Sequence, residues 1–372
     1  MKTAVLTSSR ADYGIYLPLL KKMEADCFFD LHLLVFGTHL SERFGKTIGE
    51  IEKNGFRISA RLNTTPEDDI PGSISRSMAN TIKAFSAIWE NEDYDLVIAL
   101  GDRYEMFAAV TSLMPFNIPV AHIHGGETTQ GAFDNAFRHS ITHMSVLHFT
   151  AAEEYRKRVA ELKGSDENIY NTGALAIDLL SKTELLTVVQ IKEIYKIDMT
   201  LPTILVTFHP ETMNYSRNRE NVSTLIDALS NLSKYQLVIS MPNADTSGML
   251  IREHLNAFIS KNMNAIGVEN LGSTGYLSCM KYCSFLLGNS SSGFIEASWF
   301  PKPVINIGRR QEGRILTPNI YSCKIDTDEI LAAVRDAEMA EFDSESGIYG
   351  DGDASGKMIK QIKRYFKTED ND

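Results

Sequence analysis

The stretch "HIHGGETTQGAFDNAFRHS" crowds ionisable side chains around a double glycine. Glu127 follows the two glycines, and Asp134 and Arg138 stand four residues apart, a spacing that puts both on one face of a helix. His139 lies beside them, and a third carboxylate, Asp102, follows the apolar run "DLVIALG". Carboxylates gathered on neighbouring strand ends are costly unless their protonation is tuned. The pattern therefore predicts general acid–base catalysis.

Simpler interpretations exist for several of these residues. Asp102 precedes the helix-like "MFAAVTSLM", so on its own it is more typical of a helix N-cap. His122 and His124 alternate with Ile123, which on a strand would turn both imidazoles to one side. A metal is conceivable there, but two histidines lack a third ligand at a suitable spacing. We expect them to line or support the site, and we expect no metal and no cofactor.

A second polar cluster follows the apolar run "FLLG" in the other half of the chain. Ser290, Ser291 and Ser292 enter a helix-like segment, where hydroxyls, backbone amides and the helix dipole would favour an anion such as a diphosphate. Capping of that helix is the simpler interpretation. Glu296 lies one to two expected helical turns further on, where a carboxylate could accept hydrogen bonds from two sugar hydroxyls.

Three further strand ends carry polar residues. "TSSRADYG" lacks the glycine pattern of a nicotinamide or flavin site and offers Arg10, either as a phosphate contact or as a surface partner of Asp12. "VTFHPE" places His209 at a strand end, where a core or capping role is the alternative. "MPNADTSG" supplies Asn243 and Asp245, which could contact a base or a sugar. A redox enzyme is disfavoured by the missing glycines.

Strand-like and helix-like stretches alternate along the chain, which predicts parallel sheets covered on both faces. The expected strands are "TAVLTS", "FDLHLLVFG", "DLVIALG", "IPVAHIHG", "LHFTA", "TILVTFHP", "YQLVISMP", "SFLLGNS" and "KPVINIG". The alternation pauses at about residues 182–201 and then restarts. We therefore expect two doubly wound α/β domains, with ligands at the carboxyl ends of their strands.

Composition narrows the class of protein. The chain has 372 residues, 43% of them hydrophobic, and a net charge of −11, which disfavours a nucleic-acid partner. The four cysteines show no CxxC spacing and suggest buried thiols in a reducing compartment, so we expect a cytoplasmic protein. "KTAVLTSS" is too quickly polar for a signal peptide, and no apolar run suits a membrane span.

Taken in order, the motifs resemble those of the UDP-N-acetylglucosamine 2-epimerase family, in particular its hydrolysing branch in sialic acid and nonulosonate synthesis. They are "SSRADYG", "GDRYE", "HIHGGE", "FDNAFRHS", "FHPET", "MPNADT", "GNSSSGFIEA", "RRQEGR" and "YGDGDASGKM". The resemblance implies a glycosyltransferase-B-like fold with Rossmann-like domains over 1–183 and 184–354. It also implies a C-terminal helix, 355–372, that crosses back to the first domain, a UDP-sugar substrate and a homodimer or homotetramer.

The resemblance also implies roles for individual residues. By position, Asp102, Glu127 and Asp134 match the catalytic acids, Arg138 and His209 the basic substrate contacts, Arg10 and Ser290–Ser292 the diphosphate contacts, and Glu296 the ribose contact. His139 fits the pattern of the hydrolysing branch, and His209 is a second candidate for removing the C2 proton. Glu127 and Asp134 are the expected proton-transfer groups, and Asp102 is a further acid–base group or an orienting group.

The activity that follows is conversion of UDP-N-acetylglucosamine and water to N-acetylmannosamine and UDP, by elimination of UDP and hydration of the resulting glycal. One alternative is a hydrolysing 2-epimerase of a UDP- or GDP-linked 2,4-diacetamido-6-deoxy sugar. Another is a non-hydrolysing 2-epimerase. A retaining glycosyltransferase and a non-enzymatic sugar-nucleotide binder remain as other classes, although neither requires three grouped acids.

Overall fold

The chain folds into two compact units in the computed structural model, which describes residues 1–130, 133–211, 215–242, 248–300, 302–339 and 347–369. The first unit comprises Met1–Glu127, Asp134–Ser181 and Ile348–Asp372. The second comprises Thr128–Phe133 and Lys182–Gly347. The chain therefore passes briefly into the second unit directly after Glu127, and it returns to the first unit at its C-terminal end.

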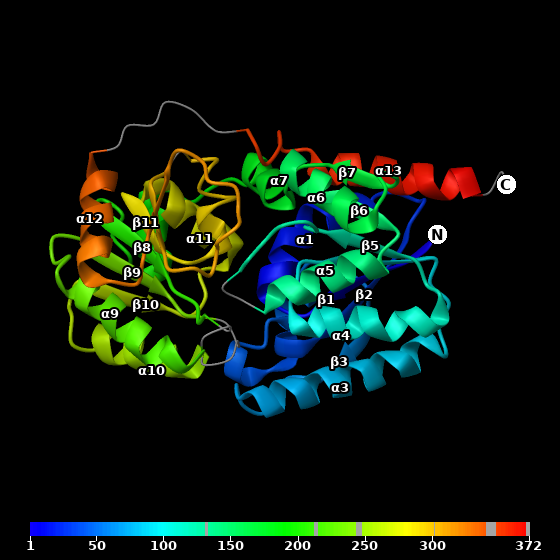
Figure 1. Cartoon of the computed structure of the whole chain (residues 1–372), viewed down its shortest axis with the longest axis horizontal. Coiled ribbons are helices and arrows are strands. Elements are labelled where there is room, and N and C mark those ends of the chain that lie inside the picture. The colour runs from blue at the N-terminus through cyan, green and yellow to red at the C-terminus, as the bar shows by residue number, and fades with distance from the viewer. Residues whose placement is uncertain (131–132, 212–214, 243–247, 301, 340–346, 370–372) are drawn as a thin grey trace. The chain divides into compact units, whose positions relative to one another are not determined.

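The first unit contains a seven-stranded parallel sheet in the order β3-β2-β1-β4-β5-β6-β7 (Figure 1). Its strands are β1 Lys2–Thr7, β2 Asp30–Phe36, β3 Ile58–Leu62, β4 Leu96–Leu100, β5 Val120–Ile123, β6 Leu147–Thr150 and β7 Ile169–Asn171. Its α-helices are α1 Arg10–Glu24, α2 Ile48–Lys53, α3 Pro71–Trp89, α4 Tyr104–Leu113, α5 Asp134–Met144, α6 Glu153–Lys163, α7 Leu175–Lys182 and α13 Ala354–Glu369. Short 3-10 helices are η1 Gly37–Leu40, η2 Glu42–Phe44 and η3 Met114–Phe116.

Both faces of this sheet are buried, which explains why its central strands are continuously apolar. On β1, Val5 joins a core that includes Tyr16 of α1, while Ala4 and Leu6 join a second core that includes Trp89 of α3. Successive side chains of a strand point to opposite faces, so two helical layers are needed to cover them. This confirms the predicted α/β class.

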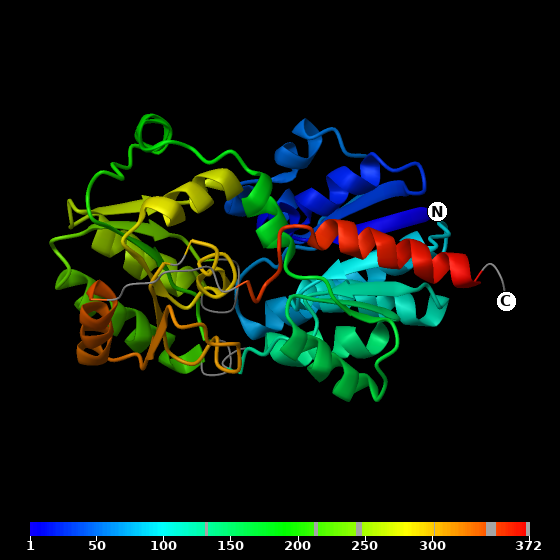
Figure 2. The ribbon, with the colours of Figure 1, turned by 90° about the horizontal axis from the view of Figure 1, so that it is seen from above.

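The C-terminal helix α13 packs on the first unit, beside α1 (Figure 2). Ala354, Met358 and Ile362 of this helix are buried in the same core as Tyr16. The predicted return of the C-terminal helix to the first domain is therefore confirmed.

The second unit contains a six-stranded parallel sheet in the order β10-β9-β8-β11-β12-β13. Its strands are β8 Thr203–Thr207, β9 Gln236–Ser240, β10 Ala265–Val268, β11 Phe285–Gly288, β12 Val304–Ile307 and β13 Ile320–Cys323. Its helices are α8 Val188–Tyr195, α9 Asn218–Ser230, α10 Gly248–Ile259, α11 Gly272–Tyr282 and α12 Thr327–Glu338, with 3-10 helices η4 Tyr215–Arg217 and η5 Ser291–Gly293. The pause predicted at about 182–201 contains α8.

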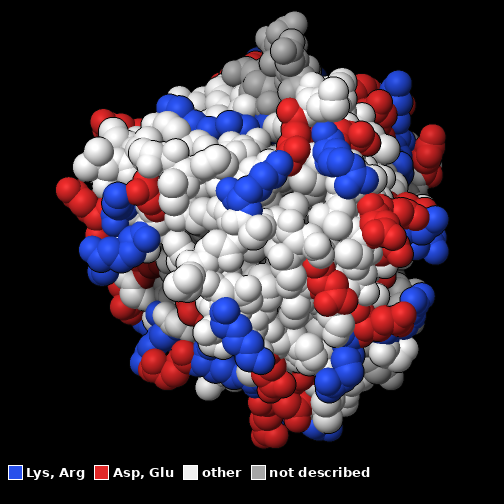
Figure 3. All heavy atoms as spheres, turned by 90° about the vertical axis from the view of Figure 1, so that its left-hand side faces the viewer, with Lys and Arg blue, Asp and Glu red and all other residues white. Residues whose placement is uncertain are grey.

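Charged side chains of both signs are interspersed on the face shown in Figure 3, with a broad uncharged area between them. This face therefore lacks the single-sign basic surface that nucleic-acid binders use. Within the described residues, none of the helices combines the length and the apolar character needed to cross a bilayer.

Candidate active site

Asp102 lies just beyond the carboxyl end of β4, after Gly101, whose φ of 77° is in the left-handed region. The N-cap position of α4 is occupied by the next residue, Arg103, without a side-chain cap. Asp102 is therefore not the N-cap of this helix. Its carboxylate instead forms an ion pair with the guanidinium of Arg138.

Arg138 joins two of the predicted catalytic carboxylates. It lies on α5, is 2% exposed, and its second nitrogen, Nη1, is 3.7 Å from Oε2 of Glu127. Glu127 is also 2% exposed. One buried guanidinium thus offsets the charge of two acids from different loops. Asp134 opens the same helix, so the predicted placement of Asp134 and Arg138 on one helix is confirmed.

His124 forms a short contact with Glu127, from Nδ1 to Oε1 at 2.5 Å. The strand β5 ends at Ile123, and His124 has a φ of 65°, so the predicted strand alternation of the two histidines is wrong. The chain turns back here because Gly126, with a φ of 80°, approaches the backbone of α6: a Cβ on it would lie 2.3 Å from the carbonyl oxygen of Tyr155. This turn brings Glu127 back to His124.

His122 has a structural role. Its Nε2 is 2.8 Å from the carbonyl oxygen of Gly101, and its Nδ1 is 3.1 Å from Oγ1 of Thr142 on α5. Burial lowers the pKa of His122 to about 4, with a smaller contribution from the charge of Arg138, so the imidazole is neutral near pH 7. His122 therefore ties the loop before Asp102 to the helix that carries Arg138.

His139 follows Arg138 on α5 and is partly buried. Burial lowers its pKa, and the neighbouring positive charge of Arg138 lowers it further. A neutral imidazole next to a guanidinium can accept or donate one hydrogen bond without adding to the positive charge.

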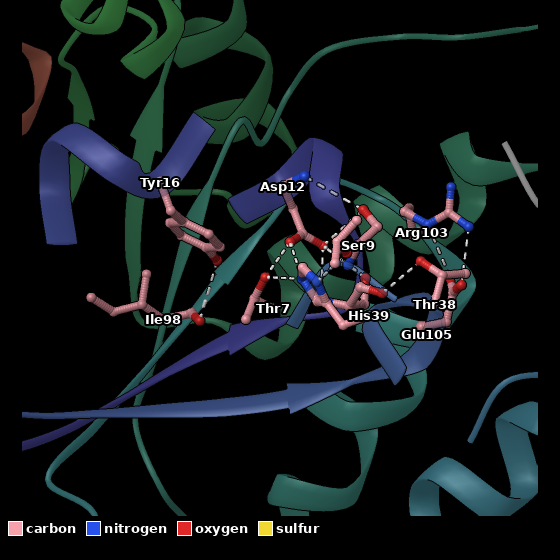
Figure 4. Close-up of polar contacts among 11 residues, drawn as sticks. Thr7, Ser9, Asp12, Tyr16, Thr38, His39, Ile98, Arg103 and Glu105 are labelled. Carbon is pink, nitrogen blue, oxygen red and sulfur yellow. Dashed lines mark hydrogen bonds and ion pairs between the residues drawn. The ribbon is translucent and has the colours of Figure 1, made fainter. Parts of the chain in front are cut away.

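Arg10 opens α1 beyond the first strand, next to the turn that contains Ser9 and Asp12, which Figure 4 shows. The neighbouring Asp12 accepts hydrogen bonds from the amides of Ser8 and Ser9 at 2.9 and 3.0 Å and belongs to the capping box of α1. Burial by itself raises the pKa of Asp12, but the hydrogen bond and charge of His39 hold it below its usual value. The carboxylate of Asp12 therefore has a structural role, because it stabilises the turn that precedes Arg10.

The "LGDRYE" motif contains an ion pair that sequence reasoning missed. Arg103 donates through Nε and Nη2 to the two carboxylate oxygens of Glu105, at 3.1 and 3.0 Å (Figure 4). Glu105 is fully buried. A bidentate pair of this kind holds the loop after β4 in one geometry, next to Asp102.

The helix predicted after Asn289 is wrong. Only Ser291–Gly293 forms a helix, the single 3-10 turn η5, and turns follow up to residue 300. Backbone hydrogen bonds here have irregular spacing: the amide of Ile295 donates four residues back, and that of Ala297 donates five residues back. A helix dipole consequently gives little support for an anion at this turn, and Glu296 lies within turns rather than on a helix.

The serine hydroxyls are instead part of a local network. Oγ of Ser292 donates to Oγ of Ser290 at 3.0 Å, and Oγ of Ser290 accepts from the amide of Ser292 at 3.3 Å. The hydroxyl of Tyr276 is 2.6 Å from Oγ of Ser292. Burial raises the pKa of Tyr276 to about 12, so its hydroxyl remains a hydrogen-bond donor. Tyr276 was not identified from the sequence, where it has no motif of its own.

His209 follows β8 and is held by Asn289 through its backbone. The amide of His209 donates to Oδ1 of Asn289 at 2.7 Å, and Nδ2 of Asn289 donates back to the carbonyl of His209 at 2.8 Å. This pairing joins the loop after β8 to the serine turn after β11. Asn243 and Asp245 lie outside the described residues.

The loop that contains "GRRQEGR" borders a cavity of about 940 Å³ in the second unit. Charges of both signs line it. Oε1 of Glu211 accepts from the amide of Arg309 at 2.7 Å, and Nε of the buried Arg314 donates to Oε1 of Gln311 at 2.5 Å. The sequence did not predict this cavity and indicated only an additional charge at Arg309. The cavity forms from residues of α9, β12 and β13, which lie far apart in the sequence and come together only in the fold.

Among the described residues, no three His, Cys, Asp or Glu side chains gather in a way that could hold a metal ion. A family model described as UDP-N-acetylglucosamine 2-epimerase matches residues 21–363. The chain belongs to this family. It is therefore an enzyme of the sugar-nucleotide 2-epimerase class, and the family resemblance of its motifs is confirmed.

Three relatives of this 2-epimerase are similar over most of their length. GDP/UDP-N,N'-diacetylbacillosamine 2-epimerase (hydrolyzing) of Campylobacter jejuni is 35% identical, over 92% of this chain and 88% of its own. Polysialic acid biosynthesis protein P7 of Escherichia coli is 32% identical, over 100% and 96%. UDP-N,N'-diacetylbacillosamine 2-epimerase (hydrolyzing) of Legionella pneumophila is 31% identical, over 97% and 95%.

A solved structure shows the same fold. The UDP-GlcNAc 2-epimerase of Neisseria meningitidis, bound to UDP-GlcNAc, matches this 2-epimerase with a TM-score of 0.82 and 17% identity, over 98% of this chain and 100% of that one. The expected glycosyltransferase-B-like architecture of two Rossmann-like domains is confirmed.

Proposed function

We propose that this 2-epimerase is hydrolysing and acts on UDP- or GDP-linked N,N'-diacetylbacillosamine. It releases the nucleoside diphosphate and the free sugar with inverted C2. The acid–base chemistry is supported by the largely buried cluster in which Arg138 contacts both Asp102 and Glu127, and Glu127 contacts His124. The identity of the sugar is supported by the names of the relatives with 35% and 31% identity. UDP-N-acetylglucosamine, which the sequence favoured, becomes the second candidate.

Loss of the nucleotide must precede or accompany proton removal. The C2 proton of the sugar has no neighbouring carbonyl and is barely acidic. When the C1–O bond to the diphosphate stretches, the ring gains oxocarbenium character and the C2 proton becomes acidic, while negative charge collects on the diphosphate. We assign that charge to Arg10 and to the hydroxyls and amides of Ser290–Ser292, and the ribose to Glu296.

Inversion at C2 requires proton transfers on opposite faces of the ring. We assign these transfers to groups among Asp102, Glu127, Asp134 and His209, because one group cannot serve both faces. Arg138, His139 and Asn243 are assigned to substrate contacts. Addition of water at C1 of the glycal completes the hydrolysis, and the free sugar is a suitable precursor for nonulosonate synthesis.

Two further properties belong to the proposal. We expect a cytoplasmic protein, since the buried Cys279 and Cys283 are free thiols and suit a reducing compartment. We also expect a homodimer or homotetramer, which light scattering of the purified chain would test.

The experiment is incubation with three sugar nucleotides in deuterated water: UDP-N-acetylglucosamine and the UDP- and GDP-linked forms of N,N'-diacetylbacillosamine. NMR should detect a free mannose-configured sugar with deuterium at C2, together with the nucleoside diphosphate. Faster turnover of UDP-N-acetylglucosamine would contradict the proposed sugar. Accumulation of an intact epimerised sugar nucleotide would contradict hydrolysis.

A further inference from the structure

The contact between His124 and Glu127 suggests a division of labour that the motifs did not indicate. We propose that His124, through Nε2, is the base that removes the C2 proton, and that Glu127 is its positioning residue. This inference rests on the proposed elimination and specifies the group that performs its first proton transfer.

Glu127 is poorly placed to act as the base itself. Its Oε1 is 2.5 Å from Nδ1 of His124, its Oε2 is 3.7 Å from Nη1 of Arg138, and the residue is 2% exposed. A carboxylate whose two oxygens face a hydrogen-bond donor and a guanidinium has little free lone-pair density for a carbon-bound proton. Both oxygens are suited to orienting their neighbours.

His124 has the opposite arrangement. Its contact with the carboxylate assigns the proton to Nδ1, which leaves the lone pair on Nε2. Nε2 is buried and has no hydrogen-bond partner among the described residues. The residue is 7% exposed, so the imidazole is held rather than solvated. An imidazole oriented by a carboxylate and open at its other nitrogen is the arrangement of a general base.

The backbone of His124 supports the same interpretation. Its φ of 65° lies in the left-handed region, which is uncommon for a residue with a side chain. Gly126 holds the turn against α6, where a Cβ would meet the carbonyl oxygen of Tyr155 at 2.3 Å. His124 therefore adopts an unfavourable backbone conformation, and this conformation places its imidazole beside Glu127.

His122, the other histidine of the motif, cannot take this role. Both of its ring nitrogens are engaged, one with the carbonyl of Gly101 and the other with Thr142. Charged and titratable groups around His124 are Glu127, then Arg138 and Asp102 through the ion-pair chain, and the neutral His122. The carboxylate of Glu127 is the nearest of them and stabilises an imidazolium.

In the proposed elimination, one bond of the sugar nucleotide breaks at C1 and one at C2. The C1–O bond breaks and its electron pair leaves with the diphosphate. The electron pair of the C2–H bond becomes the second bond between C1 and C2, and the proton goes to Nε2 of His124. The products are the nucleoside diphosphate, a glycal and an imidazolium beside Glu127. The imidazolium then releases its proton to solvent, while a group on the other face protonates C2 during hydration.

The test compares His124→Asn, Glu127→Gln and a control, His143→Asn, on the sugar nucleotide that the wild-type enzyme turns over. Asparagine preserves a donor toward Glu127 but has no basic nitrogen. We expect His124→Asn to lower kcat by roughly 100- to 10,000-fold with little change in KM. His143 is an exposed residue of α5, and its substitution should leave kcat within about twofold of the wild type, as for surface changes away from the site.

Glu127→Gln supplies a readout that a merely structural role would not move. Removal of the carboxylate charge destabilises the imidazolium that forms during proton removal, so kcat should fall while KM changes little. Nitrogen-15 NMR of the wild-type enzyme should find His124 protonated at Nδ1, and this measurement needs no activity. Nearly full activity of folded His124→Asn, or protonation of His124 at Nε2 alone, would overturn the inference while wild-type hydrolysis leaves the proposed function standing. Absence of wild-type turnover on the whole panel would overturn both.

Discussion

Asp178 binds the N-terminal turn of the C-terminal helix α13, and its substitution should let this helix undock from the first unit. Asp178 lies on α7 and is fully buried. Its Oδ1 accepts from the amide of Ala354 at 2.6 Å, and its Oδ2 accepts from the amide and the hydroxyl of Ser355 at 2.8 and 2.5 Å. These amides open α13, so the carboxylate also faces the positive end of the helix dipole.

The free energy lost in Asp178→Ala can be estimated from these contacts. Loss of a helix cap costs about 1 kcal/mol, and each hydrogen bond to a charged group contributes about 1.5–3 kcal/mol. Such contributions overlap, since all three share one carboxylate. Asp178→Ala should therefore destabilise the docked state of α13 by about 2–4 kcal/mol, which corresponds to a roughly 30- to 700-fold larger population of the undocked helix.

Amide hydrogen exchange followed by mass spectrometry measures this population for peptides of α13. The control is Asp351→Asn. Asp351 is exposed, accepts from the amide of Asp353 at 3.2 Å and forms a surface pair with Lys357 at 2.9 Å, which is worth less than about 1 kcal/mol. Asparagine keeps an acceptor for the amide and removes only the charge of the surface pair. Exchange of α13 in Asp178→Ala within about threefold of the wild type would refute the reasoning. Equal acceleration throughout the first unit would also refute it, since the predicted effect is local undocking.

Two further predictions concern stability. Burial lowers the pKa of His122 to about 4 and that of His148 to about 3. Below pH 6.5 the unfolded chain binds protons that the folded chain does not, so the free energy of unfolding should fall on acidification toward pH 4, by up to about 2.7 kcal/mol per pH unit. The urea midpoint should fall with it, and a rising midpoint would contradict this. Gly288→Ala should cost about 3 kcal/mol or more, seen as a lower Tm, because its Cβ would lie 1.9 Å from the carbonyl oxygen of Thr207; Gly55→Ala, with a φ of 78° and open space, should cost less.

The strands divide into those that the sequence could reveal and those that it could not. All nine predicted strands are present, and each is a continuously or almost continuously buried run, as in β1, β4 and β8. The four strands that were missed are β3, β7, β10 and β13, which lie at the edges of the two sheets. Edge strands are covered on fewer sides, so β3 alternates between partly buried and exposed residues and lacks an apolar run.

Some features of the candidate site could also be predicted from the sequence, and others could not. The sequence identified Asp102, Glu127 and Arg138, because ionisable residues at strand ends stand out against apolar runs. It did not indicate that Arg138 would contact both acids, nor that the chain would turn at His124. It predicted a helix after Ser290, where the structure has a single 3-10 turn.

The sequence by itself determined the alternation of buried strands and helices, the family and the set of residues available for acid–base chemistry. Such features depend on local composition and spacing, which are legible along the chain. The tertiary structure alone decided which carboxylate is paired with which cation and which imidazole keeps a nitrogen without a partner among the described residues. It also decided that Asp178 accepts a hydrogen bond from the first turn of α13, 176 residues further along the chain. Contacts of this kind depend on where distant backbone segments meet, and hydrogen-bond geometry over a few ångströms is not encoded by residue type alone.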